Sequence, residues 1–110
     1  MQMKACYFLS LAISLPAIAG VQTGKVDTLI ARASDNLHLV TLSGGEKTNS
    51  PECALRNYWM IKDESSSAGK SQFSQLLSAK LANKEVTILG LNTCTRWGDG
   101  EDINTIVIED

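Results

Sequence analysis

A cluster of planar and charged side chains near the C-terminus is the first candidate for chemistry. Arg96, Trp97 and Asp99 lie within four residues, and Glu101 and Asp102 follow after one glycine. Sugar sites commonly combine an aromatic ring, which covers the C–H face of the sugar, with planar polar groups that bind hydroxyls. We therefore expect Trp97, Arg96 and Asp99 to contribute to a ligand-binding site.

The same acidic residues suit a metal poorly. Calcium takes six to eight oxygen ligands, and three carboxylates within residues 99–102 are too few and too close to supply them. Their spacing also differs from that of a twelve-residue calcium loop. We expect no metal here, and the competing interpretation of residues 98–102 is a solvated turn in which Trp97 covers the end of the fold.

No catalytic set accompanies these residues. His38 is the only histidine, no acid or nucleophile stands at a recognisable spacing from it, and we expect it on the surface of a strand. Asp63 and Glu64 are interpreted as charge at a helix start. The sequence therefore predicts that the protein is not an enzyme and takes no cofactor.

Residues 1–19 have the pattern of a cleavable secretory signal peptide. Lys4 supplies the positive start, an apolar run follows, and Ala17, Ile18 and Ala19 form the small-x-small pattern before the cut. A membrane anchor is the alternative, but Pro16 interrupts the run before it reaches the roughly 20 residues that a bilayer needs. We expect a secreted or periplasmic protein with no membrane span, whose single domain comprises residues 20–110.

Export changes the cysteine count and the charge. Cys6 leaves with the signal peptide, so Cys53 and Cys94 remain and are expected to form a disulfide. A redox pair is disfavoured because the two cysteines do not form a C-x-x-C motif. Loss of Lys4 leaves nine basic against twelve acidic residues, a net charge of −3. Nucleic acid is therefore not an expected partner.

The elements that must position the candidate site follow from periodicity. Apolar and polar residues alternate in three early segments and two late ones, which predicts five strands at residues 26–33, 37–42, 56–62, 85–91 and 103–108. In the first of these, Val26, Thr28 and Ile30 are expected to share one face. Between them, residues 65–83 show helical spacing, and an apolar stripe is expected from Phe73, Leu76, Leu77 and Leu81.

Three strands, a helix and two strands follow the order of a five-stranded OB-fold barrel, which is the fold class expected here. An open α+β sheet with one covering helix shares these elements and is the alternative. In an OB-fold the first and fourth loops border the binding face. Asp35 and Asn36 of the first loop are therefore expected beside Arg96 and Trp97.

Several segments carry a resemblance to known proteins. Residues 58–62 (Tyr-Trp-Met-Ile-Lys), the helix start at residues 68–73 and the strand leading to Cys94 resemble small secreted OB-fold proteins that serve as B subunits of bacterial toxins, of the subtilase cytotoxin B subunit type. Residues 93–97 (Thr-Cys-Thr-Arg-Trp) and 99–103 (Asp-Gly-Glu-Asp-Ile) are similar to the ending of a group of uncharacterised secreted proteins of Gram-negative bacteria. The resemblance implies a ring-forming homo-oligomer that recognises a glycan.

The functional expectation is a non-enzymatic, secreted or periplasmic binding module that recognises a carbohydrate through the Trp97 segment. The alternative is an envelope structural or accessory protein. It would bind a protein partner through a sheet edge or through the face that carries Tyr58 and Trp59.

Overall fold

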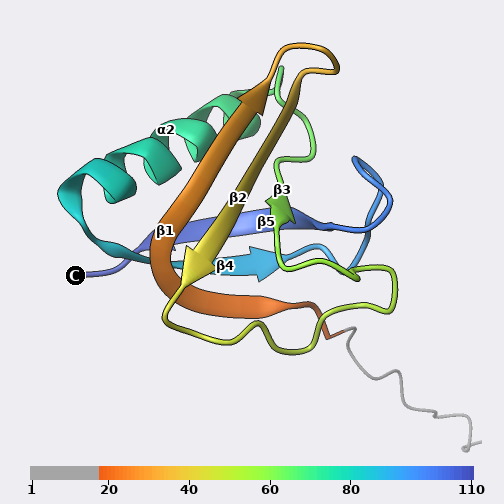
Figure 1. The fold of residues 1–110 in the computed structure, drawn as a ribbon, viewed down its shortest axis with the longest axis horizontal. Helices are drawn as coiled ribbons and strands as arrows, with labels where there is room; N and C mark the ends of the chain where they lie inside the picture. The colour runs from red at the N-terminus through yellow and green to blue at the C-terminus, as the bar shows by residue number, and fades with distance from the viewer. Residues whose placement is uncertain (1–17) are drawn as a thin grey trace, which may run out of the picture.

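The computed structural model describes residues 18–110, so the signal-peptide prediction lies almost entirely outside the described residues. The chain forms five strands and one helix (Figure 1). In order these are β1 (Val21–Arg32), β2 (Leu37–Ser43), β3 (Trp59–Met60), α2 (Ser67–Ala82), β4 (Glu85–Gly90) and β5 (Glu101–Ile108).

The strands close into a barrel in the order β1-β2-β3-β5-β4. The first half of β1 pairs with β4 and its second half with β2, while the short strand β3 runs parallel to β5 and completes the closure. This topology confirms the predicted OB-fold-like barrel and excludes the open sheet. The closure is short, because β3 pairs through Trp59 and Met60 alone with β2 and with β5.

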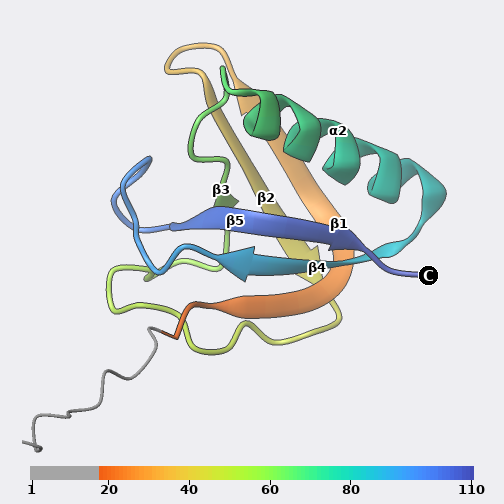
Figure 2. The same ribbon diagram turned by 180° about the vertical axis from the view of Figure 1, so that it is seen from behind.

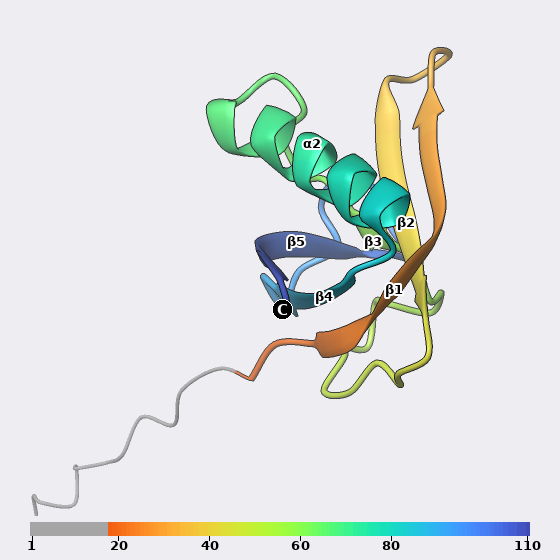
Figure 3. The ribbon, with the colours of Figure 1, turned by 90° about the vertical axis from the view of Figure 1, so that its left-hand side faces the viewer.

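A bulge in β1 explains why one prediction of its faces is wrong. The pairing of β1 with β2 shifts register between Val26 and Thr28, so the alternation of inward and outward side chains is interrupted there. Val26 is buried and Leu29 packs against the core, whereas Ile30, predicted on the same face as Val26, is 38% exposed. Figure 3 shows the strong bend of β1 that lets it serve two neighbours.

The core has two parts. The barrel interior contains side chains from all five strands and α2, among them the fully buried Trp59 and Ile61. A smaller cluster of Leu37, Leu39 and Met60, covered by Tyr58, lies on the other face of β2 and β3. Trp59 is fully buried, so only Tyr58 of the expected Tyr58–Trp59 contact face reaches the surface.

Helix α2 confirms the predicted helix and half of its apolar stripe, because Phe73 and Leu76 pack in the core while Leu77 and Leu81 do not. The Ser66 hydroxyl caps its start by accepting from the Gly69 amide, and Asn83 ends it in the left-handed conformation. Leu76 and Ala79 are buried, whereas Leu77 is 43% and Leu81 79% exposed. The helix lies between the β1–β2 hairpin and strand β5 (Figures 2 and 3), and the face that packs there carries Phe73, Leu76 and Ala79.

The predicted disulfide is present. Cys53 and Cys94 are bonded across a sequence separation of 41 residues, with their Cα atoms 6.1 Å apart. The bond joins the long connection before β3 to the connection between β4 and β5, residues 91–100, which we call the Trp97 loop.

Candidate functional site

The tip of the β1–β2 hairpin lies against the Trp97 loop. Arg96 donates from Nη2 to the Asp35 carbonyl oxygen at 3.0 Å, and the Arg32 guanidinium lies 5.3 Å from the centre of the Trp97 ring. Arg32 also pairs with Asp35, and this hydrogen bond is the main reason that the pKa of Asp35 is lowered. The structure therefore brings Asp35, Arg96 and Trp97 together, with Trp97 41% exposed.

Arg96 is held by internal contacts. Its Nε lies 2.9 and 3.0 Å from the two carboxylate oxygens of Glu64, and both side chains are largely covered. The Arg96 side chain thus joins three segments: the hairpin through Asp35, its own loop, and the turn before α2 through Glu64. Glu64 is therefore not helix-start charge as expected; the first turn of α2 contains no acidic residue.

Asp99 is committed to a different neighbour. It accepts a hydrogen bond from the Tyr58 hydroxyl and lies 3.6 Å from Arg56 Nε. Burial raises the pKa of Tyr58, and the bond to Asp99 raises it further because that bond requires the phenol to keep its proton. Asp99 consequently holds Tyr58 in place over the small cluster, and its carboxylate oxygens are already engaged by Tyr58 and Arg56.

Asn36 stands at the hairpin tip in the left-handed conformation, with a φ of 59° and an exposed side chain. Its carbonyl oxygen lies 3.0 Å from His38 Nδ1. When the neutral ring donates from Nδ1 to this carbonyl, Nε2 is left as a hydrogen-bond acceptor. Asn36 and His38 therefore offer an amide and an imidazole side by side.

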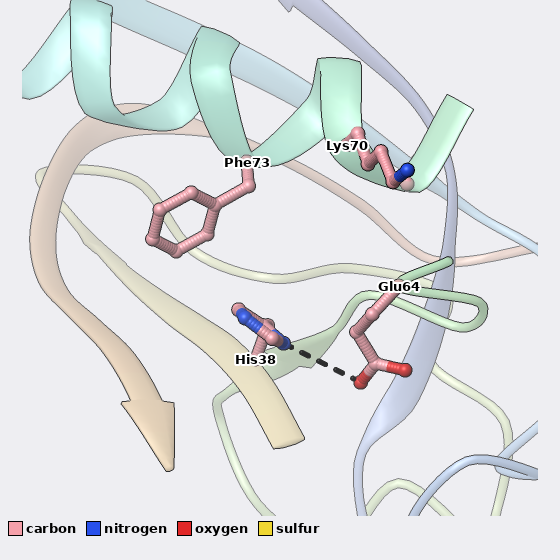
Figure 4. Close-up of a pocket in the computed structure, with 5 residues that line it drawn as sticks. His38, Glu64, Lys70 and Phe73 are labelled. Carbon is pink, nitrogen blue, oxygen red and sulfur yellow. Dashed lines mark ion pairs between the residues drawn. The ribbon is translucent and has the colours of Figure 1, made fainter. Parts of the chain in front are cut away.

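A groove runs past His38 at the end of the barrel. It consists of adjoining pockets of about 170, 250 and 440 Å³ that share His38 as a lining residue. We call it the His38 groove, and its other lining residues include Arg32, Asn36, Glu64, Ser65, Gly69, Lys70, Phe73 and Arg96. Figure 4 shows Phe73 extending down from α2 and Lys70 beside the start of the helix, while His38 and Glu64 face each other below them.

Most lining residues of this groove were not among those expected to bind a ligand, His38, Glu64, Lys70 and Phe73 above all. His38 Nδ1 lies 3.6 Å from Glu64 Oε2, and the His38 ring meets the Phe73 ring edge-on at 5.2 Å. Lys70 completes the set from the first turn of α2. His38 is half-buried rather than on an outer strand surface. The sequence signal for this was its two-residue spacing from Val40 and Leu42, which puts His38 on the same strand face as these core residues.

Asp102 organises the Trp97 loop from beneath. It is fully buried at the start of β5 and accepts bonds from the hydroxyls of Thr93 and Thr95 and from the amides of Thr95 and Arg96. Burial alone would raise the pKa of Asp102, but these four hydrogen bonds outweigh burial, so its pKa is lowered. Glu101 is also fully buried, so the interpretation of residues 98–102 as a solvated turn is wrong for its last two residues.

Within residues 18–110, no group of three or more His, Cys, Asp or Glu side chains is placed to hold a metal ion. The helix in this range is too short and too polar to cross a membrane. Comparison with known proteins finds no matching family, no matching curated protein and no matching solved structure. The resemblance to toxin B subunits therefore rests on residue pattern and element order alone.

Proposed function

We propose that this protein is an exported, non-enzymatic binding module that recognises a carbohydrate in the His38 groove, with Trp97 at the rim. The disulfide supports an oxidising compartment, since such bonds persist mainly in secreted and periplasmic proteins. A hairpin tip and the Trp97 loop border the groove, as the first and fourth loops border the binding face of OB-fold barrels.

The convergence of three pockets on His38 is the observation that carries the proposal. The groove is open and combines the aromatic Phe73 with an imidazole and the exposed Asn36 at the hairpin tip. Sugar hydroxyls both donate and accept, so they match a site that offers an acceptor nitrogen beside amide and ammonium donors. The Arg96–Glu64 pair holds the groove wall in place before any ligand arrives, which lowers the ordering cost of binding.

The charges in the groove favour a sugar that carries a carboxylate. Arg96 is paired with Glu64 and Arg32 with Asp35, whereas Lys70 takes part in no ion pair within residues 18–110. Lys70 also stands in the first turn of α2, where the helix dipole favours anions. An acidic glycan would therefore place its carboxylate near Lys70 and its hydroxyls near His38 and Asn36.

A glycan array that contains matched neutral and acidic oligosaccharides tests this function. We expect acidic members to be bound, and we expect Lys70→Gln to weaken their binding by about tenfold, the loss of one charge-assisted contact. Lys84→Gln is the matched control, because Lys84 is an exposed lysine just past the opposite end of α2. Absence of binding to any member, or equal weakening by both substitutions, contradicts the proposal.

A further inference from the structure

Glu101 is a buried carboxylate at the opposite end of the barrel from the hairpin tip, beside the N-terminal end of β1. Its side chain is fully inaccessible, and its Oε2 accepts from the amides of Gly20 and Asn92, each at 3.0 Å. Its Oε1 is the one buried side-chain oxygen or nitrogen in residues 18–110 that has no hydrogen-bond partner. Such an atom is costly, because a carboxylate removed from water needs compensating donors.

Gly20 lies directly against this carboxylate. A β-carbon on Gly20 would overlap Oε1, and one on Gly90 would overlap Oε2, so two glycines are needed to admit the carboxylate. Gly20 is itself buried and is held in place by the Gly90 amide, which donates to the Gly20 carbonyl oxygen at 2.8 Å. Both carboxylate oxygens of Glu101 therefore face the residue that is expected to begin the exported chain.

Lys47, whose charge interacts with Glu101, does not supply the missing donor to Oε1. Lys47 Nζ lies 4.0 Å from the centre of the Trp59 ring and donates to the Tyr58 carbonyl oxygen at 3.5 Å. Burial lowers the pKa of Lys47 despite the opposing influence of Glu101. No ion pair joins Lys47 to Glu101, so Oε1 needs a donor from elsewhere.

We propose that removal of the signal peptide supplies this donor: the new α-ammonium of Gly20 forms a buried ion pair with Glu101. The proposal rests on the expected cut after Ala19. Hydrolysis of the Ala19–Gly20 peptide bond adds water across it and leaves a carboxylate on Ala19 and an ammonium on Gly20. The amide that bonds Oε2 thereby becomes a cation with three N–H donors, one of which can remain on Oε2 while a second reaches Oε1.

Cleavage after Ala19 then gives the buried Glu101 carboxylate its cationic partner. In the uncut chain the Gly20 nitrogen has one proton and no charge, so Glu101 is buried without a bonded cation. In the cut chain the same atom carries a positive charge at the same position. The exported form is therefore more stable than the precursor, although every strand of the barrel lies after Gly20 and is present in both.

Thermal unfolding of two chemically matched chains tests the ion pair. One chain begins with a free Gly20, and the other has the Gly20 nitrogen acetylated, which keeps one N–H and removes the charge. We expect the free chain to unfold roughly 4–8 °C higher, and we expect Glu101→Gln to abolish this difference. Equal unfolding temperatures for the two wild-type chains would overturn the proposal.

Amine labelling keeps the test decisive if the Glu101→Gln chain does not fold. In the folded wild-type chain a buried, paired α-ammonium should react about tenfold or more slowly with an acylating reagent than in the unfolded chain. Fast labelling would overturn the ion pair. Mass spectrometry of the exported protein examines the cut separately: a first residue other than Gly20 overturns the processing step without bearing on the His38 groove.

Discussion

At the scale of single residues, adjacent carboxylates in β5 have different environments. Asp102 receives four hydrogen bonds from the Trp97 loop, while the neighbouring Glu101 receives two and retains a bare oxygen. The sequence indicated an acidic cluster beside Trp97 but not which members were buried. That outcome depends on β5 beginning at Glu101, two residues before the periodicity indicated, which only the pairing with β3 establishes.

Asp102→Asn should destabilise the protein by about 2–3 kcal/mol at pH 7, since buried hydrogen bonds to a charged acceptor are lost or weakened. The pKa of Asp102 is lower in the folded protein, so its contribution is fully present above the ordinary Asp pKa of about 3.9. The contribution is lost as the pH falls through the lowered folded value. Urea unfolding between pH 7 and pH 2.5 should show the gap between wild type and variant closing with acid.

Asp110→Asn is the control for this titration, because Asp110 is exposed beyond the end of β5. It should change stability by less than about 0.5 kcal/mol at every pH. A difference between wild type and Asp102→Asn that stays constant down to pH 2.5 would show that the charge of Asp102 contributes nothing.

Arg96→Lys should make the groove wall around Arg96 more mobile and should reduce the free energy of unfolding only slightly. Lysine keeps the charge but cannot reach the Glu64 carboxylate and the Asp35 carbonyl oxygen together. We expect a loss of about 1 kcal/mol in unfolding free energy and a change in Trp97 emission. Arg56→Lys provides the comparison, since Arg56 is exposed and does not line the groove. Identical emission from wild type and Arg96→Lys would contradict the positioning role of Arg96.

At the scale of elements, the sequence predicted the number, type and order of strands and helix but only part of the buried helix face. Leu77 and Leu81 continue the apolar spacing of α2 but are exposed. The residues buried against the barrel are Leu76 and Ala79. The apolar spacing within one helix does not determine which side of the helix packs on the sheet. The bulge in β1 is invisible in the sequence for the same reason, because register is a property of two strands.

Two leucine substitutions distinguish the helix faces. Leu76→Ala should cost about 3 kcal/mol by leaving a cavity in the barrel interior, whereas Leu81→Ala should change stability by less than about 0.5 kcal/mol. Denaturant midpoints for the two variants give the comparison. A larger cost for Leu81→Ala would mean that the exposed side of α2 is covered in solution.

Reduction of the disulfide should act first on the Trp97 loop. The loop-entropy contribution of the 41-residue separation is about 4 kcal/mol. We expect the barrel strands to keep their pairing when the bond is broken, because none of the strands contains either cysteine. We expect a red shift of tryptophan emission on reduction in wild type and none in Trp97→Phe, whose remaining Trp59 is buried. Unchanged wild-type emission would contradict the link between the bond and the loop.

At the scale of the whole molecule, two regions have different roles. The hairpin tip, the start of α2 and Arg96 line an open groove, and the expected N-terminus closes around Glu101 at the base of the Trp97 loop. Element order predicted the approach of the first and fourth loops, and the structure joins them through Arg96 and Asp35. It could not predict the His38 groove, because Glu64 and Lys70 reach it from a turn and a helix whose placement depends on the closed barrel.

Amide NMR during titration with an acidic oligosaccharide selected on the array tests the central claim most directly, because it locates the ligand. Binding in the His38 groove predicts shift changes at Asn36, His38, Gly69 and Lys70, while Thr48, which pairs with Val21 at the opposite end, stays unchanged. Shift changes confined to the Thr48 end, or none at saturating ligand, would contradict the assignment of the groove as the binding site.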